Sequence, residues 1–332
     1  MAEQKLKWGV ISTANIGWDK VIPGVQLSEN NKIVAIGSEN VAKAEKIAAD
    51  NGIDRVHESY EELINDPDID IVYNPLPNNL HVEWSIKALQ AGKHVLCEKP
   101  LAMTAGETQR LLDEAKKHPK LKLMEAFMYK FHPQWLKVRA LLDKGSIGEV
   151  RTVNTFFSYF NTDPNNIRNR VEVGGGALMD IGCYCISFPR FLLGEEPINV
   201  QSTIELDPVM KTDKMTSAIL EFSEGKTATF TCSTQLAPYQ RCIVYGKEGH
   251  IEIEIPCNAP IDKPCKMWLR ANGKEELIEI VVSNQYTYQA DALAKFIRED
   301  ADMTYYLDDM LGNMKVIDAV VKSSREGKRV DV

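Results

Sequence analysis

Hydrophobic positions divide the chain into two halves with different periods. Up to residue 130, short and nearly continuous apolar runs alternate with amphipathic segments of helical period. Such runs are typical of parallel strands that are covered on both faces, and short connections between them favour a layered α/β fold. The pattern therefore predicts a doubly wound parallel sheet, with strands at 6–12, 32–36, 69–73, 95–97 and 121–124.

Beyond residue 130 the apolar and polar positions alternate in longer runs. Residues 227–232 and 250–255 show this period of two most clearly. Alternation of this kind predicts a large, open, mostly antiparallel sheet with one half-solvated face. Because such a face needs cover, we expect the chain to form a homodimer or a higher homo-oligomer through it. Helices are expected at 18–27 in the first half and at 133–144, 287–299 and 308–324 in the second.

The turn after the first predicted strand has the layout of a dinucleotide-binding motif. In G-x-G-x-x-G, glycines let a pyrophosphate approach the N-terminus of the following helix. Only the third glycine, Gly17, is present here, and small residues, Ser12 and Ala14, stand in the first two positions. An ordinary strand-to-helix turn is the alternative interpretation. We expect cofactor contacts from Ser12, Thr13, Ala14, Asn15 and Ile16.

Two residues after the second predicted strand bear on the choice of cofactor. Glu39 lies 22 positions past Gly17, where an acidic residue suits a ribose 2′-hydroxyl and repels a 2′-phosphate. Ser38 can still hydrogen-bond a phosphate. The expected cofactor is therefore NAD or NADP, with a preference for NAD.

Polar residues also follow the later strands, at the edge where open α/β sheets bind ligands. Glu98 and Lys99, an acid and an amine, come directly after the strand at 95–97 and precede Pro100. A surface ion pair before a turn is the alternative interpretation of these two charges. The loop after the strand at 69–73 adds further expected cofactor contacts, at Pro75, Leu76, Asn78 and His81. A surface position at the start of a helix accounts equally well for His81.

A second informative segment lies between the first two strands of the second half. Three glycines, 174–176, allow a close backbone approach or an unusual turn before a helix. Asp180 and Tyr184 are four residues apart and share one helical face. A tyrosine acts as a general acid and base if its pKa, about 10 when unperturbed, is lowered. An ammonium such as Lys99 would lower that pKa by favouring the phenolate. The alternative is a packed Tyr184 whose hydroxyl is bonded to Asp180.

Composition narrows the class of protein. The 332 residues suggest two domains, and a net charge of −8 argues against nucleic acid or an anionic membrane as a partner. No uninterrupted apolar run approaches the roughly 18 residues of a membrane span. The first residues are polar and lead into a strand, so we expect no signal peptide. Seven cysteines without a CxxC pair favour reduced thiols, a cytoplasmic location and no metal site.

Taken together, the chain resembles the glucose–fructose oxidoreductase / inositol dehydrogenase / MocA family over nearly its whole length. The resemblance is carried by residues 8–17, 91–100, 125–133 and 174–184. Many members have histidine four positions after the aspartate, whereas this chain has Tyr184. In this respect it is similar to the aldose (xylose or glucose) dehydrogenases and to dimeric dihydrodiol dehydrogenase.

The resemblance implies a Rossmann domain, expected at 1–126, and an α+β domain for substrate binding and dimerisation, expected at 127–332. It implies that Lys99, Asp180 and Tyr184 are catalytic and that Glu98 contacts the nicotinamide ribose or carboxamide. Substrate contacts are expected from Phe127, Tyr129 and Arg168. Two positions depart from the pattern: Lys130 stands where relatives usually have arginine, and Glu39 replaces the arginine of many NADP-using members.

The expected activity is hydride transfer between NAD(P) and a CH–OH group of a sugar, polyol or dihydrodiol. The family's alternative activity is transfer between two sugars with the cofactor held throughout. A non-catalytic NAD-binding regulator on the same scaffold is the remaining hypothesis.

Overall fold

The computed structural model describes residues 4–332, which form two compact units. Unit 1 comprises the chain up to Met128 together with Asn284–Leu311, and unit 2 comprises Tyr129–Ser283 with Gly312–Val332. The domain boundary expected from the sequence falls after residue 126, with 127–332 in one domain. The structure instead returns 284–311 to unit 1.

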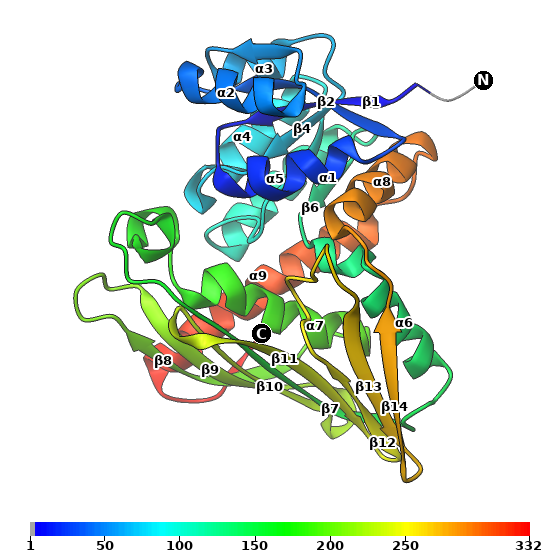
Figure 1. Cartoon of the computed structure of the whole chain (residues 1–332). Coiled ribbons are helices and arrows are strands. Elements are labelled where there is room, and N and C mark those ends of the chain that lie inside the picture. The colour runs from blue at the N-terminus through cyan, green and yellow to red at the C-terminus, as the bar shows by residue number, and fades with distance from the viewer. Residues whose placement is uncertain (1–3) are drawn as a thin grey trace. The chain divides into compact units, whose positions relative to one another are not determined.

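Unit 1 is built on a parallel sheet whose strands have the order β3-β2-β1-β4-β5-β6 (Figure 1). This confirms the predicted doubly wound sheet. The order reverses between β1 and β4, so the carboxyl ends of these strands form the edge where such sheets bind ligands. The strands are β1 Leu6–Ile11, β2 Asn31–Gly37, β3 Arg55–His57, β4 Ile71–Asn74, β5 His94–Cys97 and β6 Leu123–Glu125.

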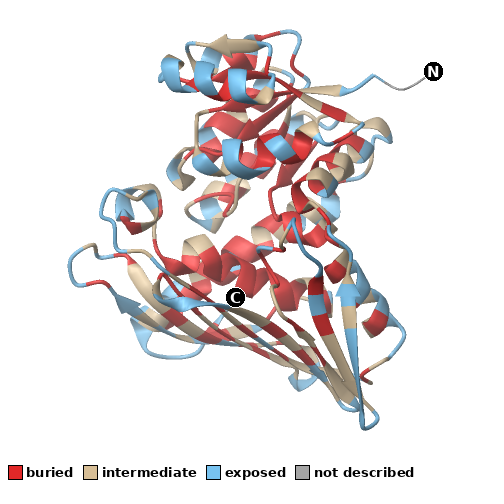
Figure 2. Cartoon of the chain, viewed as in Figure 1, coloured by how far each residue is buried: buried red, intermediate tan, exposed pale blue. Residues whose placement is uncertain are grey.

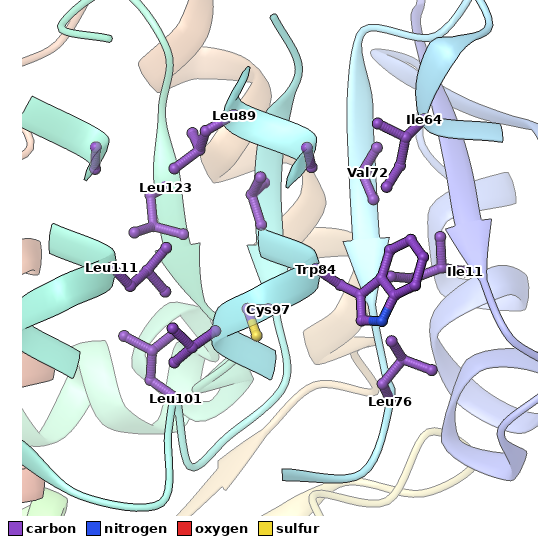
Figure 3. Close-up of a cluster of buried hydrophobic side chains, with 14 of the residues drawn as sticks. Ile11, Ile64, Val72, Leu76, Trp84, Leu89, Cys97, Leu101, Leu111 and Leu123 are labelled. Carbon is purple, nitrogen blue, oxygen red and sulfur yellow. The ribbon is translucent and has the colours of Figure 1, made fainter. Parts of the chain in front are cut away.

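Helices cover this sheet, and capping side chains fix where several of them begin. Asn40, Ser59 and Thr104 each accept a hydrogen bond from the backbone N–H three residues later, as N-cap residues do. Apolar side chains between the helices and the sheet form the core, with Val72, Trp84 and Leu111 among them (Figure 3). The helices are α1 Ile22–Gln26, α2 Val41–Asn51, α3 Tyr60–Asn65, α4 Asn78–Gln90, α5 Ala105–Lys117 and α8 Gln285–Arg298.

The helix predicted at 18–27 is not a single α-helix. A π-helical turn, Gly17–Val21, precedes α1, and Pro23 lies in the first turn of α1. Proline is tolerated there because the first helical N–H groups have no partner within the helix. Pro23 thus marks the start of α1 and does not kink it.

Polar contacts explain why residues after 283 return to unit 1. The Asp291 carboxylate accepts hydrogen bonds from the Ser28 hydroxyl at 2.6 Å and the Asn30 amide at 3.0 Å. Arg298 donates to the Asn30 side chain at 2.7 Å. Met310, at the beginning of α9 (Thr304–Glu326), belongs to the buried cluster of unit 1.

Unit 2 is a nine-stranded sheet of order β14-β13-β12-β11-β7-β10-β9-β8-β15. Neighbouring strands are antiparallel except for β7 and β10, which are parallel, so the predicted, mostly antiparallel sheet is confirmed. The strands are β7 Val150–Phe160, β8 Asn199–Leu206, β9 Asp213–Glu221, β10 Thr227–Ser233, β11 Gln235–Gly246, β12 Gly249–Ile253, β13 Cys265–Ala271, β14 Lys274–Ile280 and β15 Val330–Asp331.

Among residues 4–332, the helices of unit 2 cover one face of this sheet. In Figure 1, α6 (Pro133–Asp143), α7 (Cys183–Leu193) and the C-terminal part of α9 lie over the same face. Figure 2 shows that this side is buried, whereas much of the opposite face is partly or fully exposed. Within residues 4–332, the stretch Val171–Leu193 alone has the length and mean hydropathy, 1.2, of a membrane-spanning helix, and 83% of its most apolar window is buried in the protein. Its helical part, from the turn at Leu178–Gly182 through α7, is mostly buried in unit 2.

Candidate active site

The turn after β1 forms the cradle expected of a dinucleotide-binding motif, although two of its glycines are missing. Ser12 adopts φ 77°, the left-handed conformation that favours glycine. Its hydroxyl accepts a hydrogen bond from the Ala14 N–H at 3.3 Å, and the Gly17 N–H donates to the Ala14 carbonyl at 3.0 Å. The turn therefore leads β1 directly into the N-terminus of a helix, and its small side chains leave the backbone accessible. These residues fit the pyrophosphate of a dinucleotide.

A carboxylate and an ammonium lie near the end of β2. The Ser38 hydroxyl is buried and accepts a hydrogen bond from the Asn40 N–H at 3.1 Å, so it fixes the start of α2. Glu39 is exposed. Lys43, in the first turn of α2, donates from Nζ to the Thr13 carbonyl at 2.8 Å. The region expected to receive the adenosine ribose therefore contains charges of both signs.

The loop after β4 is held in place by the buried Asn74 side chain. Its amide nitrogen donates to the His81 carbonyl at 3.0 Å and to the Ser85 hydroxyl at 3.1 Å, and its oxygen accepts from the Leu76 N–H at 3.3 Å. Pro75 and Leu76 are buried, and Asn78 begins α4. The loop is therefore a rigid part of unit 1, at the carboxyl end of β4.

His81 corrects one expectation. It does not begin a helix at the surface, because α4 starts three residues earlier and the side chain of His81 is 0% exposed. Its Nε2 and Nδ1 lie 2.7 Å from the Leu76 carbonyl and 2.8 Å from the Pro100 carbonyl. Burial lowers the pKa of His81 to about 4. A neutral ring carries one N–H, so His81 donates to one of these two carbonyls and lies between the loops after β4 and β5. Its expected cofactor contact stays a prediction.

Glu98 and Lys99 stand at the carboxyl end of β5, as expected. The Tyr73 hydroxyl donates to Glu98 Oε1 at 2.8 Å, and the Lys99 N–H lies 3.3 Å from Oε2. Burial raises the pKa of Tyr73, and the neighbouring Glu98 carboxylate raises it further. Tyr73 therefore stays protonated and orients the carboxylate. The peptide bond between Lys99 and Pro100 is cis.

In unit 2, two side chains donate hydrogen bonds to the carboxylate of Asp180. The Tyr159 hydroxyl donates to Asp180 Oδ2 at 2.6 Å, and the Arg168 Nε donates to the same oxygen at 3.0 Å. Burial raises the pKa of Tyr159, and the Asp180 charge raises it further, so this phenol is a proton donor. Asp180 lies in a π-helical turn, Leu178–Gly182, that leads into α7. Short π segments of this kind often occur at functional sites.

Tyr184 lies one helical turn after Asp180, inside an aromatic cluster. Its side chain is 5% exposed. The rings of Tyr129, Phe157 and Phe188 have centroids 6.2, 6.3 and 6.3 Å from its own. These contacts fix the direction of the phenol, which a group that exchanges a proton requires.

The glycine triplet lets the backbone of Arg168 lie close to the start of this helix. This is the close backbone approach expected from the sequence. The Gly176 N–H donates to the Arg168 carbonyl at 2.8 Å, and the Gly175 N–H donates to the Arg170 carbonyl at 2.9 Å. A Cβ atom on Gly175 would lie 2.6 Å from the Arg168 carbonyl oxygen. A side chain at this position would therefore push the Arg168 segment away.

The remaining expected substrate residues are buried. Tyr129 is 0% exposed, and its hydroxyl lies 2.7 Å from the Ser187 hydroxyl in the core of unit 2. Its ring packs against Trp135 and Phe188. These contacts give Tyr129 a packing role in unit 2, and its expected substrate contact stays a prediction. Phe127 and Lys130 are also buried.

Tyr73 and Tyr159 are site residues that the sequence analysis did not single out. Both are at or near the end of a strand. The period of two offers a signal for Tyr159, because it places this residue on the same face of β7 as the buried Phe157. No comparable signal marks Tyr73, which lies in a continuously buried strand.

The strand order of unit 1 and the turn after β1 define a dinucleotide-binding protein of the Rossmann type. Comparison with known proteins agrees. Residues 6–127 match the family described as "Oxidoreductase family, NAD-binding Rossmann fold", and residues 135–252 match the "GFO/IDH/MocA C-terminal domain". The chain belongs to the GFO/IDH/MocA family and is an NAD(P)-dependent oxidoreductase.

Similar proteins extend over the whole chain. An uncharacterized oxidoreductase of Rhizobium meliloti is 39% identical over 327 residues, covering 97% of this chain and 98% of that protein. D-xylose 1-dehydrogenase (NADP(+)) 2 of Haloferax volcanii is 32% identical, covering 98% and 100%. The crystal structure of the aldose–aldose oxidoreductase of Caulobacter crescentus, complexed with glycerol, matches with a TM-score of 0.92 at 29% identity, covering 99% and 100%.

Proposed function

We propose that this protein transfers hydride between NAD(P) and a CH–OH group of a sugar, polyol or dihydrodiol, with Lys99, Asp180 and Tyr184 as its catalytic residues. The observation that carries the proposal is the Asp180 carboxylate, held by Tyr159 and Arg168 one helical turn before Tyr184. The printed names of the xylose dehydrogenase and the aldose–aldose oxidoreductase support a carbohydrate-like substrate.

Each residue has a distinct role in this proposal. NAD(P) supplies the hydride chemistry when it is bound. Tyr184 takes the proton of the substrate hydroxyl, and the Lys99 ammonium favours the phenolate and stabilises negative charge on the substrate oxygen. Asp180 orients substrate hydroxyls or the lysine. Glu98, oriented by Tyr73, contacts the nicotinamide ribose or carboxamide.

The proposed cofactor preference is for NAD. The exposed Glu39 carboxylate repels a 2′-phosphate and suits the two hydroxyls of an unmodified ribose. Two observations support measurable use of NADP as well. The ammonium of Lys43 lies at the same end of the sheet, and the similar xylose dehydrogenase is named for NADP(+).

The proposed activity is tested with a panel of aldoses, polyols and dihydrodiols, followed by absorbance of the reduced nicotinamide with NAD and NADP in parallel. We expect Tyr184→Phe to lower kcat by about 10²-fold or more, the smallest usual contribution of a general acid–base group, while NADH still binds. Tyr288→Phe, an exposed tyrosine on α8, is the matched control and should keep full activity. Full activity in Tyr184→Phe would refute the role of Tyr184. Cofactor binding without turnover of any compound would favour the non-catalytic regulator.

A second candidate is hydride transfer between two sugars with the cofactor retained throughout. The similarity to the aldose–aldose oxidoreductase favours this possibility. Nicotinamide that stays with the protein through gel filtration, and turnover of paired sugars without added cofactor, would support it. Turnover that requires added NAD(P) would exclude it.

We further infer that the uncovered face of the unit 2 sheet forms a homodimer or higher homo-oligomer, in the cytoplasm. Apolar side chains are exposed on this sheet, among them Ile219, 47% exposed between the buried Ala218 and Leu220 of β9, and Leu277, 49% exposed on β14. The seven cysteines are buried thiols, which suits a reducing compartment. Sedimentation equilibrium should give at least twice the 37.3 kDa chain mass, and Ile219→Glu should lower it. A monomer at micromolar concentration would contradict the inference.

A further inference from the structure

Asp213, the first residue of β9, reaches the start of the helix that carries Asp180 and Tyr184. Its Oδ2 accepts hydrogen bonds from the Leu178 N–H at 2.7 Å and from the Thr216 hydroxyl at 3.0 Å. The backbone of Ala177 also donates to this carboxylate. A carboxylate at this end is favoured by the N–H groups that the helix itself leaves unpaired and by the helix dipole.

This helix depends on a distant residue for its cap. The residue at its own N-cap position is Ala177, which has no capping side chain. The cap comes instead from Asp213, which is 35 positions later than Leu178 in the chain. The hydrogen bond from Leu178 to Asp213 anchors the start of this helix. It therefore helps to set the positions of Asp180, two residues later, and of Tyr184, one turn further on.

Gly176 makes room for the Asp213 carboxylate. It has φ 121°, and a Cβ atom there would lie 1.8 Å from Asp213 Oδ1. The third glycine of the triplet is therefore required by Asp213, whereas the second, Gly175, is required by the backbone of Arg168. Two neighbouring glycines thus let two different groups approach the same helical turn: the Arg168 backbone at Gly175 and the Asp213 carboxylate at Gly176.

Keeping a charge at this position opposes folding stability. Burial raises the pKa of Asp213 to about 6, although the hydrogen bonds from Leu178 and Thr216 lower it. Since the folded pKa is above the unfolded value of 3.8, the contribution of this group to stability decreases as the pH rises from 3.8 through 6. The charged carboxylate therefore caps the helix at a cost in stability.

Titratable groups around Asp213 respond to its charge. Tyr159 on β7 and Cys232 on β10 both have their pKa raised by burial and additionally by the Asp213 carboxylate. Lys214, next to Asp213 on β9, is paired with Glu205 at 2.7 Å. The negative charge of Asp213 thus adds to the rise in the pKa of Tyr159, the group that donates to Asp180.

We propose that Asp213 is a positioning residue for the reaction, which acts by anchoring the helix of Asp180 and Tyr184. This inference rests on the proposed function. Asp213 does not itself touch the reacting atoms. Its charge is retained for activity at a cost in stability, a combination that is common at functional sites.

The test compares two aspartates of unit 2 that cap neighbouring backbone. Asp207 accepts from the Val209 and Met210 N–H groups and from Gln235, and these hydrogen bonds lower its pKa. Its charge therefore favours folding, whereas that of Asp213 opposes it. We expect Asp213→Asn to lower kcat at pH 7.5 at least 10-fold with a Tm equal to or above that of the natural protein. Asp207→Asn should lower Tm and keep kcat within twofold.

Two further readouts separate positioning from a merely structural role. The pH profile of kcat should show an acid limb near pH 6 in the natural protein that is absent in Asp213→Asn. Hydrogen exchange at residues 177–182 should be faster in Asp213→Asn, while the Kd for NADH stays within twofold. Thr216→Val, which removes one hydrogen bond to Asp213, should shift the acid limb to higher pH.

Full activity of Asp213→Asn, or a parallel loss of Tm and kcat, would overturn the proposal. If Asp213→Asn does not fold, the pH profile of Thr216→Val provides the test. An acid limb of kcat at the same pH as in the natural protein would overturn the proposal. Absence of turnover by the natural protein would refute the proposed function itself. In that case hydrogen exchange still decides whether Asp213 anchors the helix, and unchanged exchange in Asp213→Asn would overturn this role.

Discussion

At the scale of single residues, the conformation of Ser12 and the partners of Asp180 define the two halves of the candidate site. Ser12 occupies a glycine position of the motif and adopts the glycine conformation, at a cost of about 1 kcal/mol for a left-handed non-glycine residue. The sequence predicts Asp180 as a site residue but not its partners, Tyr159 and Arg168. Those contacts arise between side chains that are 21 and 12 positions away from Asp180, and periodicity contains no information about such pairs.

Glu39 should control the choice between the two cofactors. We expect Glu39→Gln to lower the ratio of the Kd for NADPH to the Kd for NADH about fivefold, because a charge interaction of about 1 kcal/mol is removed. Fluorescence titration of the reduced cofactors measures both constants. Glu45→Gln, which changes an exposed carboxylate on α2, is the control and should leave the ratio unchanged. An unchanged ratio in Glu39→Gln would contradict the assignment.

At the scale of elements, most helices and strands follow from the pattern of apolar positions, and both sheets are of the predicted kind. Capping residues fix several boundaries, such as Ser59 before α3 and Gly52, in the left-handed conformation, after α2. The two π-helical turns, at 17–21 and 178–182, could not be predicted. They depend on how the chain is held at both ends, and both occur beside expected site residues.

The glycine triplet yields a prediction at this scale. Gly175→Ala should lower kcat at least 10-fold, since its Cβ would meet the Arg168 carbonyl and displace the arginine from Asp180. Its effect on Tm should be small. Gly194→Ala, at the other end of α7, meets no atom within 4 Å but has φ 70°. It should lower stability by about 1 kcal/mol and leave kcat intact. A loss of stability with normal kcat in Gly175→Ala, or a loss of kcat in Gly194→Ala, would contradict this account.

At the scale of the molecule, the sequence predicts two different sheets but not the path of the chain between them. The segment 284–311 follows the last strands of unit 2 and yet belongs to unit 1. Its assignment depends on contacts such as that of Asp291 with Ser28, which are 263 positions apart. Local pattern cannot supply these pairs, because any amphipathic helix could cover either sheet.

Buried histidines should make the protein sensitive to acid. Burial lowers the pKa of His81, His94 and His132 to about 4 each. Because these values are below the ordinary value of 6.5, the unfolded chain binds more protons between pH 6.5 and 4, and stability is lost as the pH falls through this range. The urea midpoint should therefore be lower at pH 5 than at pH 7.5.

A substitution at His132 separates this effect from general acid denaturation. His132 is the N-cap residue of α6, where it accepts from the Gln134 N–H, and asparagine preserves a capping group. His132→Asn should show a smaller drop in the urea midpoint between pH 7.5 and 5 than the natural protein. An equal drop would contradict the assignment of acid sensitivity to this group.

The most direct test of the proposed chemistry is the pH dependence of kcat for alcohol oxidation in the natural protein and in Lys99→Met. We predict that kcat in the natural protein rises with an apparent pKa below the ordinary tyrosine value of about 10. In Lys99→Met, kcat should be at least about 10²-fold lower and that pKa should move up toward 10. An unchanged pKa together with near-normal kcat in Lys99→Met would contradict the claim that Lys99 and Tyr184 act on one substrate.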